Sequence, residues 1–344
     1  MCGIAGIVGD AGPDGPEPAL RTMMKTMAHR GPDDEGLWLD PAGGCGFGHK
    51  RLAIIDPENG RQPMSNEDGS VWITFNGCIY NYQDIQRTLR ERGHRFRTHC
   101  DTEAIIHAYE EWGPDCVERF NGMWAFAIWD TRRRTLFASR DRIGVKPFYY
   151  VLRDGTLTFA SEIKALTAAG AVRPRIDVEG LRQYLTFQYC LDDRTLFEGV
   201  RNLPPGHSLL LRPGEAPQVR CFWDLAFPIE ADRDEDWFVE RLARLLEDAV
   251  RLRLRSDVPL GTHLSGGLDS STVTALARLL LGDAPLKSFT GAFRDGPAFD
   301  ETRYARIASA AAGTDYHEIY LGASDLADSI ERIIWHMDQP AAGP

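Results

Sequence analysis

The first nine residues, MCGIAGIVG, place a cysteine directly behind a methionine and ahead of a run of small and apolar residues. Removal of Met1 would leave Cys2 with a free α-amino group, whose pKa of about 8 lets it accept a proton from the neighbouring thiol. One residue would then supply both a nucleophile and its general base. Position alone equally fits a buried strand cysteine, so the choice depends on the rest of the chain.

A second stretch suited to chemistry is LSGGLDSS, which covers residues 264–271 and lies between an expected strand and an expected helix. Its two glycines allow close backbone approach. The N–H groups at the helix start and the hydroxyls of Ser265, Ser270 and Ser271 form an anion cradle that suits a triphosphate. The chain has no GxxxxGK[ST] sequence, so this is not a Walker loop. The alternative is an ordinary turn in which Asp269 caps the helix.

Three other features have mainly structural interpretations. Lys146, within GVKPFYY, can reach a phosphate, but a structural role is the more ordinary one. His317 and Glu318 lack the second histidine of a zinc-binding helix, and we place them in a strand. The aromatic residues of MWAFAIW, at 123–129, are interpreted as core.

Composition and charge exclude several classes of protein. The 344 residues predict two domains at roughly 150 residues each. A formal net charge of −11 argues against a general binder of nucleic acids or anionic membranes. The seven cysteines are scattered without CxxC spacing, which indicates neither a disulfide framework nor a zinc site and predicts a cytoplasmic protein. The chain start lacks a basic leader, and no apolar run approaches the roughly 18 residues of a membrane span.

A change of pattern divides the chain near residues 223–235. Before it, short apolar and aromatic runs alternate with turn residues, which predicts antiparallel strands: VWITF, MWAFAIW, TLFAS, FYYVL, TLTFA, SLLL and QVRCF, with helices at 101–113 and 178–188. After it, strands and helices alternate strictly, which predicts a doubly wound parallel sheet. We expect domains at 2–222 and 235–344, the second one truncated because such a sheet usually has more strands.

Several motifs accompany Cys2 in a fixed order: HRGPDDEG (29–36), GHKRLAIID (48–56), QPMSN (62–66), FNGCIYNY (75–82), DTE (101–103), SRDRIGVKPFYY (139–150) and ASEIKAL (160–166). With these residues the chain resembles glutamine amidotransferases that use an N-terminal cysteine, and specifically the asparagine synthetase family. The resemblance runs from residue 2 to the last residue. It implies an α+β, Ntn-hydrolase-like domain of antiparallel sheets layered between helices, followed by an α/β parallel-sheet domain like that of ATP pyrophosphatases.

The resemblance also assigns roles in hydrolysing glutamine. Cys2 attacks the side-chain amide, while Asn76 and the backbone N–H of Gly77 stabilise the oxyanion. Arg51 clamps the α-carboxylate, and Asp101 holds the α-ammonium. The implied glutamine-binding residues are Arg51, Leu52, Ala53, Ile54, Ile55, Asn76, Gly77, Cys78 and Asp101. This chain departs from the family at Cys78, where a glutamate is usual, so we expect weaker or altered glutamine binding.

In the second domain the resemblance implies ATP binding at Leu264, Ser265, Gly266, Gly267, Asp269, Ser270 and Gly291. Leu264 and Gly291 would line the adenosine pocket, although valine often stands in place of Gly291. ATP and Mg²⁺ are the implied cofactors, and the metal ligands stay unassigned. The implied reaction converts glutamine, aspartate and ATP into asparagine, glutamate, AMP and pyrophosphate.

Other functions stay open at this point. An enzyme of this family that amidates another carboxylate would have the same residues up to Pro344. In the family, the residues that recognise aspartate lie C-terminal to this position. A protein that ended at Pro344 would instead be a glutaminase or a regulatory protein. The expected partners are small-molecule substrates and a second copy in a homodimer, with no nucleic acid and no membrane.

Overall fold

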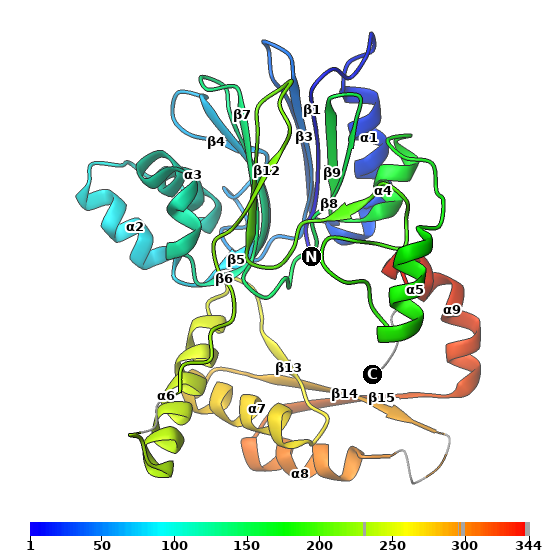
Figure 1. Ribbon diagram of the computed structural model, residues 1–344. Helices are drawn as coiled ribbons and strands as arrows, with labels where there is room; N and C mark the ends of the chain where they lie inside the picture. Colours follow the sequence, from blue (N-terminus) through cyan, green and yellow to red (C-terminus); the bar gives the residue numbers. More distant parts are fainter. Residues whose placement is uncertain (230–231, 295, 297–299, 341–344) are drawn as a thin grey trace. The chain divides into compact units, whose positions relative to one another are not determined.

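The computed structural model describes residues 1–229, 232–294, 296 and 300–340, and the chain divides into two compact units (Figure 1). Unit 1 comprises Met1–Ala226 and the segment that begins at Asp338. Unit 2 comprises Phe227–Met337. The final segment therefore returns to unit 1 after the last helix of unit 2, which no pattern in the sequence indicates.

The first sheet of unit 1 is antiparallel and has the strand order β10-β8-β9-β1-β3-β2. Its strands are β1 (Gly3–Val8), β2 (Asp34–Leu39), β3 (Cys45–Arg51), β8 (Tyr149–Arg153), β9 (Thr156–Ala160) and β10 (Arg201–Asn202). Positive φ angles at Asp154 (50°) and Gly155 (77°) close the β8–β9 hairpin, as a two-residue type I′ turn requires. Asp154 and Gly155 therefore join the expected strands FYYVL and TLTFA in a tight hairpin.

The second sheet of unit 1 is also antiparallel, in the order β12-β11-β7-β6-β5-β4. Its strands are β4 (Met64–Ser65), β5 (Val71–Ile79), β6 (Gly122–Asp130), β7 (Thr135–Arg140), β11 (His207–Leu211) and β12 (Gln218–Cys221). The apolar runs that predicted strands from VWITF to QVRCF coincide with strands of the two sheets, except that Phe148 and Phe222 lie just outside β8 and β12.

Helices cover the outer faces of both sheets (Figure 1). The helices of unit 1 are α1 (Glu17–Thr26), α2 (Tyr82–Glu91), α3 (Asp101–Trp112), α4 (Ile163–Ala168) and α5 (Val178–Phe187), with 3-10 turns at Ala28–Arg30 and Gly113–Arg119. Apolar residues of α1 and α4 pack on the first sheet, and those of α2 and α3 pack on the second. The result is the four-layered α+β arrangement that the sequence motifs imply.

Strand β6 shows how the sequence builds these layers. Trp124, Phe126 and Ile128 point into the core beneath α2 and α3, whereas Ala125 and Trp129 point into the core between the sheets. Side chains alternate between the two faces of a strand, so a continuous apolar run is what a strand buried on both faces needs. The interpretation of MWAFAIW as core is confirmed.

Unit 2 is built on a parallel three-stranded sheet in the order β13-β14-β15. Its elements are α6 (Glu235–Arg253), β13 (Gly261–His263), α7 (Leu268–Leu281), β14 (Lys287–Phe293), α8 (Thr302–Ala312), β15 (Asp315–Leu321) and α9 (Ala323–Met337). The strict alternation of strands and helices is as expected. His317 and Glu318 lie in β15, as the sequence indicated.

No helix within the described ranges is both long and apolar enough to cross a membrane.

The buried aromatic residues of β6 should carry a large share of the stability of unit 1. Phe126 is fully buried between Phe120 and Phe137. We expect Phe126→Ala to lower the free energy of unfolding by about 3–5 kcal/mol, because the cavity left in a packed core adds to the lost transfer free energy. Denaturant unfolding followed by near-UV circular dichroism measures this loss.

Phe227→Ala is the matched control, because the Phe227 side chain is 84% exposed. We expect this variant to change the free energy of unfolding by no more than about 0.5 kcal/mol. Equal effects of the two substitutions would contradict the assignment of β6 to the core.

Candidate functional site

Cys2 lies immediately before β1, a central strand of the first sheet, and its thiol contacts the chain just after β3. Its Sγ is 3.4 Å from the backbone N of Leu52, which donates to it, and 3.6 Å from the carbonyl O of the same residue. The register Gly3↔Lys50 brings the two segments together. On the other side, Arg30 donates its Nε to the Cys2 carbonyl at 2.9 Å. The cysteine is therefore fixed from both sides.

The electrostatic surroundings of the Cys2 thiol include two of the expected site residues. Burial raises the pKa of this thiol, and the charge of Asp101 raises it further, whereas the Leu52 N–H and the charge of Arg51 lower it. Arg51 and Asp101 thus act on the thiol although they lie 49 and 99 residues away along the chain. Since the thiol is not ionised by its surroundings, it needs a base to become a nucleophile.

Arg51 supports the loop that follows it. Its Nη1 donates to the carbonyl of Pro57 at 2.7 Å, and its Nη2 donates to those of Asp56 (2.7 Å) and Ile55 (3.4 Å). A guanidinium has five N–H donors, so these three bonds leave two for another acceptor. Sequence reasoning missed this loop-holding role because backbone carbonyls carry no residue signature.

The loop residues expected to line the glutamine site differ in their exposure. Leu52 contacts Cys2, and the backbone N of Ala53 bonds to Asp33 Oδ2 at 2.8 Å. Ile54 is 42% exposed, whereas Ile55 packs against the core beneath the second sheet. The segment thus combines a fixed backbone with an accessible side chain, as a ligand-facing loop requires.

Asn76 and Gly77 lie side by side on β5 of the second sheet, paired with Ala125 and Trp124 on β6. Asn76 is 1% exposed, and its Nδ2 has no hydrogen-bond partner among the described residues. A buried donor without a partner is costly, so a ligand that supplies an acceptor would remove this cost. A Cβ at Gly77 would lie 2.2 Å from the Met123 carbonyl, so only glycine fits there.

Asp101 is the first residue of α3 and is almost fully buried. Its Oδ2 accepts a hydrogen bond from the Ile79 N–H at 2.9 Å, which joins α3 to the end of β5. Burial raises the pKa of Asp101 to about 6, although this hydrogen bond acts in the opposite direction. A buried carboxylate whose pKa is raised in this way would be stabilised by a cation beside it.

Cys78 and Lys146 lie close enough to interact. Burial and the nearby Arg30 lower the pKa of Lys146, whereas Cys2 and Cys78 raise it. Lys146 donates its Nζ to Met1 Sδ at 3.2 Å. This lysine therefore lies beside the Cys2 region of unit 1.

A chain of ion pairs behind Cys2 was not foreseen from the sequence. Arg30, which holds the Cys2 carbonyl, also donates to Glu162 at 2.9 Å. Glu162 pairs with Lys164 at 2.7 Å, and Lys164 pairs with Asp338 at 2.9 Å. The motifs HRGPDDEG and ASEIKAL contain Arg30, Glu162 and Lys164, but the sequence separation of 132 between Arg30 and Glu162 hides their contact.

In unit 2 the expected anion cradle is a compact turn before α7. Ser265 Oγ and Ser270 Oγ are 3.0 Å apart, and the Gly267 N–H bonds to Ser265 Oγ at 3.3 Å. Gly266 has a φ of +86°, and a Cβ there would lie 2.4 Å from the Ala305 nitrogen. The N-cap residue of α7 is Gly267, without a side-chain cap, so the alternative in which Asp269 caps the helix is not observed.

The two residues expected at the adenosine pocket lie beside this turn. The Leu264 N–H bonds to the Phe289 carbonyl at 2.8 Å, and Thr290 Oγ1 bonds to the Leu264 carbonyl. Gly291 follows on β14, and a Cβ at this position would meet no atom within 4 Å among the described residues. The valine usual in the family would therefore fit here.

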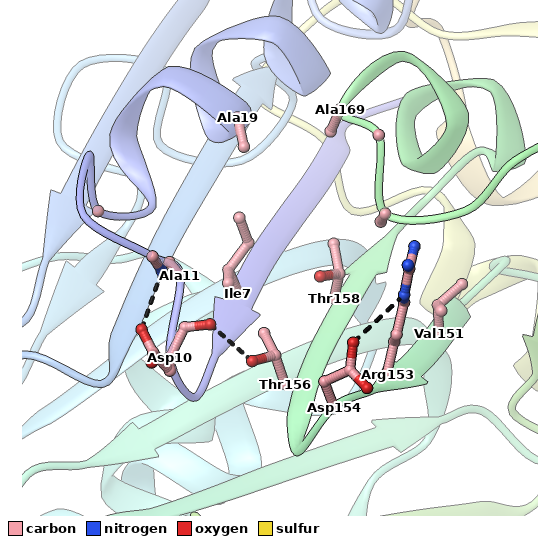
Figure 2. A pocket seen from close by; sticks show the side chains of 14 residues that line it. Ile7, Asp10, Ala11, Ala19, Val151, Arg153, Asp154, Thr156, Thr158 and Ala169 are labelled. Carbon is pink, nitrogen blue, oxygen red and sulfur yellow. Dashed lines mark hydrogen bonds and ion pairs between the residues drawn. The ribbon is translucent and has the colours of Figure 1, made fainter.

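A separate cavity of about 420 Å³ opens on the outer face of the first sheet (Figure 2). Ile7, Val151 and Thr158 form part of its lining, and none of the expected site residues does. Its polar groups are satisfied locally, since Thr156 Oγ1 bonds to the Asp10 carbonyl at 2.7 Å and Arg153 pairs with Asp154 at 3.4 Å. We assign it no function.

Two family models match the chain. A glutamine amidotransferase domain matches residues 1–223, and an asparagine synthase domain matches residues 241–344. The glutamine phosphoribosylpyrophosphate amidotransferase of B. subtilis, complexed with ADP and GMP, has a similar fold, with a TM-score of 0.50 at 16% identity over 93% of this chain and 81% of that one.

Curated relatives agree with these matches. Asparagine synthetase [glutamine-hydrolyzing] 3 of Bacillus subtilis (strain 168) is 36% identical over 92% of this chain and 54% of its own length. A putative asparagine synthetase [glutamine-hydrolyzing] 2 of Methanocaldococcus jannaschii is 34% identical over 99% of this chain and 68% of its own length. The chain spans about half the length of most of the curated relatives that it matches. On this evidence, the chain belongs to the family of glutamine-hydrolysing asparagine synthetases.

Proposed function

We propose that this protein makes asparagine, using glutamine as nitrogen donor and ATP to activate aspartate. Glutamine, aspartate, ATP and water would yield asparagine, glutamate, AMP and pyrophosphate. The observation that carries the proposal is that the Cys2 thiol contacts Leu52, the neighbour of Arg51, at 3.4 Å, with the charges of Arg51 and Asp101 both acting on the thiol. These are the groups needed to attack a glutamine amide and to hold its α-carboxylate and α-ammonium.

The glutaminase half begins with proton removal from the Cys2 thiol by the α-amino group that is exposed when Met1 is removed. The thiolate adds to the amide carbonyl of glutamine. Asn76 Nδ2, buried and without a partner in the described chain, and the Gly77 N–H would donate to the resulting oxyanion. Collapse of the intermediate expels ammonia with the proton, leaving a thioester that water hydrolyses to glutamate.

The donor amino acid would be recognised by two opposite charges. Two N–H groups of Arg51 remain for its α-carboxylate, because the other three bond to loop carbonyls. The buried Asp101 carboxylate would receive its α-ammonium. Since burial raises the pKa of Asp101, an incoming cation recovers free energy that the empty site lacks.

The ATP half would use the turn before α7. The uncapped N-terminus of this helix and the hydroxyls of Ser265 and Ser270 suit the phosphates. Asp269 supplies a carboxylate in the first turn of α7, an oxygen ligand of the kind that Mg²⁺ prefers, and Mg²⁺ would neutralise phosphate charge. Leu264 and Gly291 would border the adenosine.

The acceptor could be a carboxylate other than aspartate. Amidase chry2 of Gibberella zeae is 34% identical over 93% of this chain and 50% of its own length, so relatives with other names are almost equally similar. A cytoplasmic location, a homodimer and the lack of a nucleic-acid partner stay predictions.

Cys2→Ala should abolish the formation of glutamate from glutamine, because it removes the thiol that the proposal assigns as the nucleophile. A coupled glutamate assay measures this loss. Asparagine formation from aspartate, ATP and added ammonia should persist in the same variant, since it bypasses the thiol.

Cys221→Ala is the matched control, because Cys221 is exposed and bonds locally to the Trp223 carbonyl. It should retain full glutaminase activity. Undiminished glutamate formation in Cys2→Ala would refute the glutaminase half, and the absence of asparagine with ammonia in the wild type would refute the aspartate acceptor.

Glutamine affinity should fall as the pH drops through about 6. A carboxyl with a raised pKa is protonated below that value and can no longer pair with the α-ammonium. Asp101→Asn should weaken binding by about 2–5 kcal/mol and remove this pH dependence. KM for glutamine, measured between pH 5 and pH 8, checks both points, with the exposed Asp84→Asn as control; a pH-independent KM in the wild type would contradict the role of Asp101.

Cys78→Glu should tighten glutamine binding, because it adds a second anionic group near the α-ammonium. Cys78→Gln has the same length without the charge and serves as the matched variant. A lower KM for Glu but not for Gln is the expected result. Equal KM values for the two variants would show that charge at position 78 does not determine donor affinity.

A further inference from the structure

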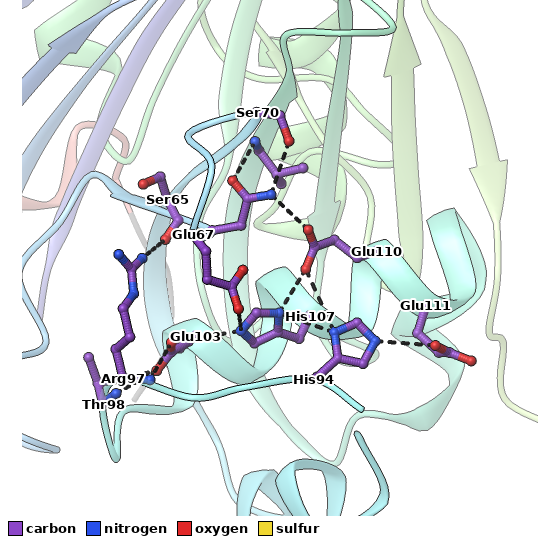
Figure 3. Close-up of polar contacts among 12 residues, drawn as sticks. Ser65, Glu67, Ser70, His94, Arg97, Thr98, Glu103, His107, Glu110 and Glu111 are labelled. Atoms are coloured by element: carbon purple, nitrogen blue, oxygen red, sulfur yellow. Dashed lines mark hydrogen bonds and ion pairs between the residues drawn. The ribbon is translucent and has the colours of Figure 1, made fainter. Parts of the chain in front are cut away.

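Two histidines and a glutamate face one another where the segment after α2 meets α3 (Figure 3). His94 belongs to that segment, and His107 and Glu110 lie one turn apart on α3. The Nδ1 atoms of the two histidines are 3.3 Å apart. Glu110 Oε2 is 2.7 Å from Nδ1 of His107 and 3.9 Å from Nδ1 of His94. Three atoms of the kinds that coordinate metal ions therefore lie around one point.

We propose that His94, His107 and Glu110 form a binding site for a divalent metal ion of the zinc type. Zinc bonds of about 2.0–2.1 Å at tetrahedral angles place two ligand atoms about 3.3 Å apart. The two Nδ1 atoms have this separation, and the two distances to the carboxylate oxygen lie on either side of it. Two imidazoles with one carboxylate are a ligand set that zinc accepts, with solvent as the fourth ligand.

The atoms of the cluster that face away from this point are also held. Asn66 donates to Glu110 Oε1 at 2.7 Å, which directs Oε2 toward the histidines. Glu111 Oε2 lies 3.2 Å from Nε2 of His94, and Arg92 holds the other oxygen of Glu111 at 2.6 Å. Metal-bound histidines commonly have a carboxylate on the second ring nitrogen, because it fixes the ring and its tautomer.

His107 has a similar arrangement on its far side. Its Nε2 faces Glu103 at 3.7 Å and Glu67 at 3.9 Å. His107 is 1% exposed, and Nε2 has no hydrogen-bond partner among the described residues. The ring of Phe96 packs against it edge-on, with centroids 4.7 Å apart. The imidazole is therefore fixed by packing, with Nδ1 directed at His94 and Glu110.

The charge around the cluster favours a cation. Carboxylates of Glu67, Glu103, Glu110 and Glu111 face the two rings, and Arg92 is the cation that pairs with one of them. A protonated His107 would also satisfy this arrangement without a metal. The two occupants are distinguishable, because only a metal joins His94 to Glu110 through a common atom.

A bound metal would tie the segment at His94 to helix α3, whose first residue is Asp101. The role of this metal would be structural, since the described residues around the site include no further nucleophile. The site is made of residues outside those assigned to glutamine and ATP, so its test is independent of the proposed function.

The test is metal binding to the whole protein after treatment with a chelator. Cys221→Ala serves as the background, because it removes an exposed thiol that would compete for zinc. We expect one zinc per chain to be retained through gel filtration, the visible absorption of a four-coordinate site with Co²⁺, and a higher Tm with zinc than without it.

Variants locate the ion. His94→Gln and Glu110→Gln should each weaken zinc binding at least tenfold and remove the zinc-dependent rise in Tm. His207→Gln is the matched control, since that ring bonds locally to the Pro205 carbonyl, and it should bind as the background does. Zinc retention that is absent in the background, or equal in all variants that fold by circular dichroism, would overturn the proposal in favour of a protonated His107.

Discussion

Desolvation of ionisable groups is the constraint on which the candidate glutamine site depends. Burial raises the pKa of both the Cys2 thiol and the Asp101 carboxyl, and thus disfavours the charges that the proposed chemistry needs. The sheets are joined nearby by His49 Nδ1 and Thr74 Oγ1 at 3.1 Å, and burial lowers the pKa of His49 to about 3, which keeps it neutral. The charges of the bound substrate would offset this desolvation cost. Donor binding would therefore also favour the charged groups that the reaction needs.

Local sequence determined the fold more fully than it determined the site. Alternating apolar runs such as MWAFAIW and the turn residues Asp154 and Gly155 specify strands and hairpins through neighbours in the chain, and the structure contains them. The turn at 264–271 was recognisable for the same reason, since eight consecutive residues make its internal contacts. The return of Asp338 to unit 1 depends on contacts with residues 163 and 164, which no local pattern encodes.

The candidate glutamine site rests on the resemblance to a family rather than on spacing. Its groups come from the start of β1, the loop after β3, the end of β5 and the start of α3, and only the fold brings them together. The sequence therefore could not predict the backbone partners of these groups. They include the carbonyls that accept hydrogen bonds from Arg51 and the Leu52 N–H that donates to Cys2. The sequence does not reveal the His94–His107–Glu110 cluster, because only His107 and Glu110 have helical spacing.

The cysteine at position 78 changes the balance of charge around the nucleophile. Arg30 and Lys146 act electrostatically on the amino terminus, and Arg51 acts on the thiol, whereas Asp101 is the acidic group that acts on the thiol most directly. A glutamate at position 78 would balance the positive charge of Lys146, whose pKa is already raised by Cys78. With cysteine there, position 78 offers no carboxylate to offset Arg30 and Lys146, whose charges act on the amino terminus. In the proposed glutamine site, Asp101 would therefore be the carboxylate left for the donor's α-ammonium, which is the physical reason to expect weaker donor binding.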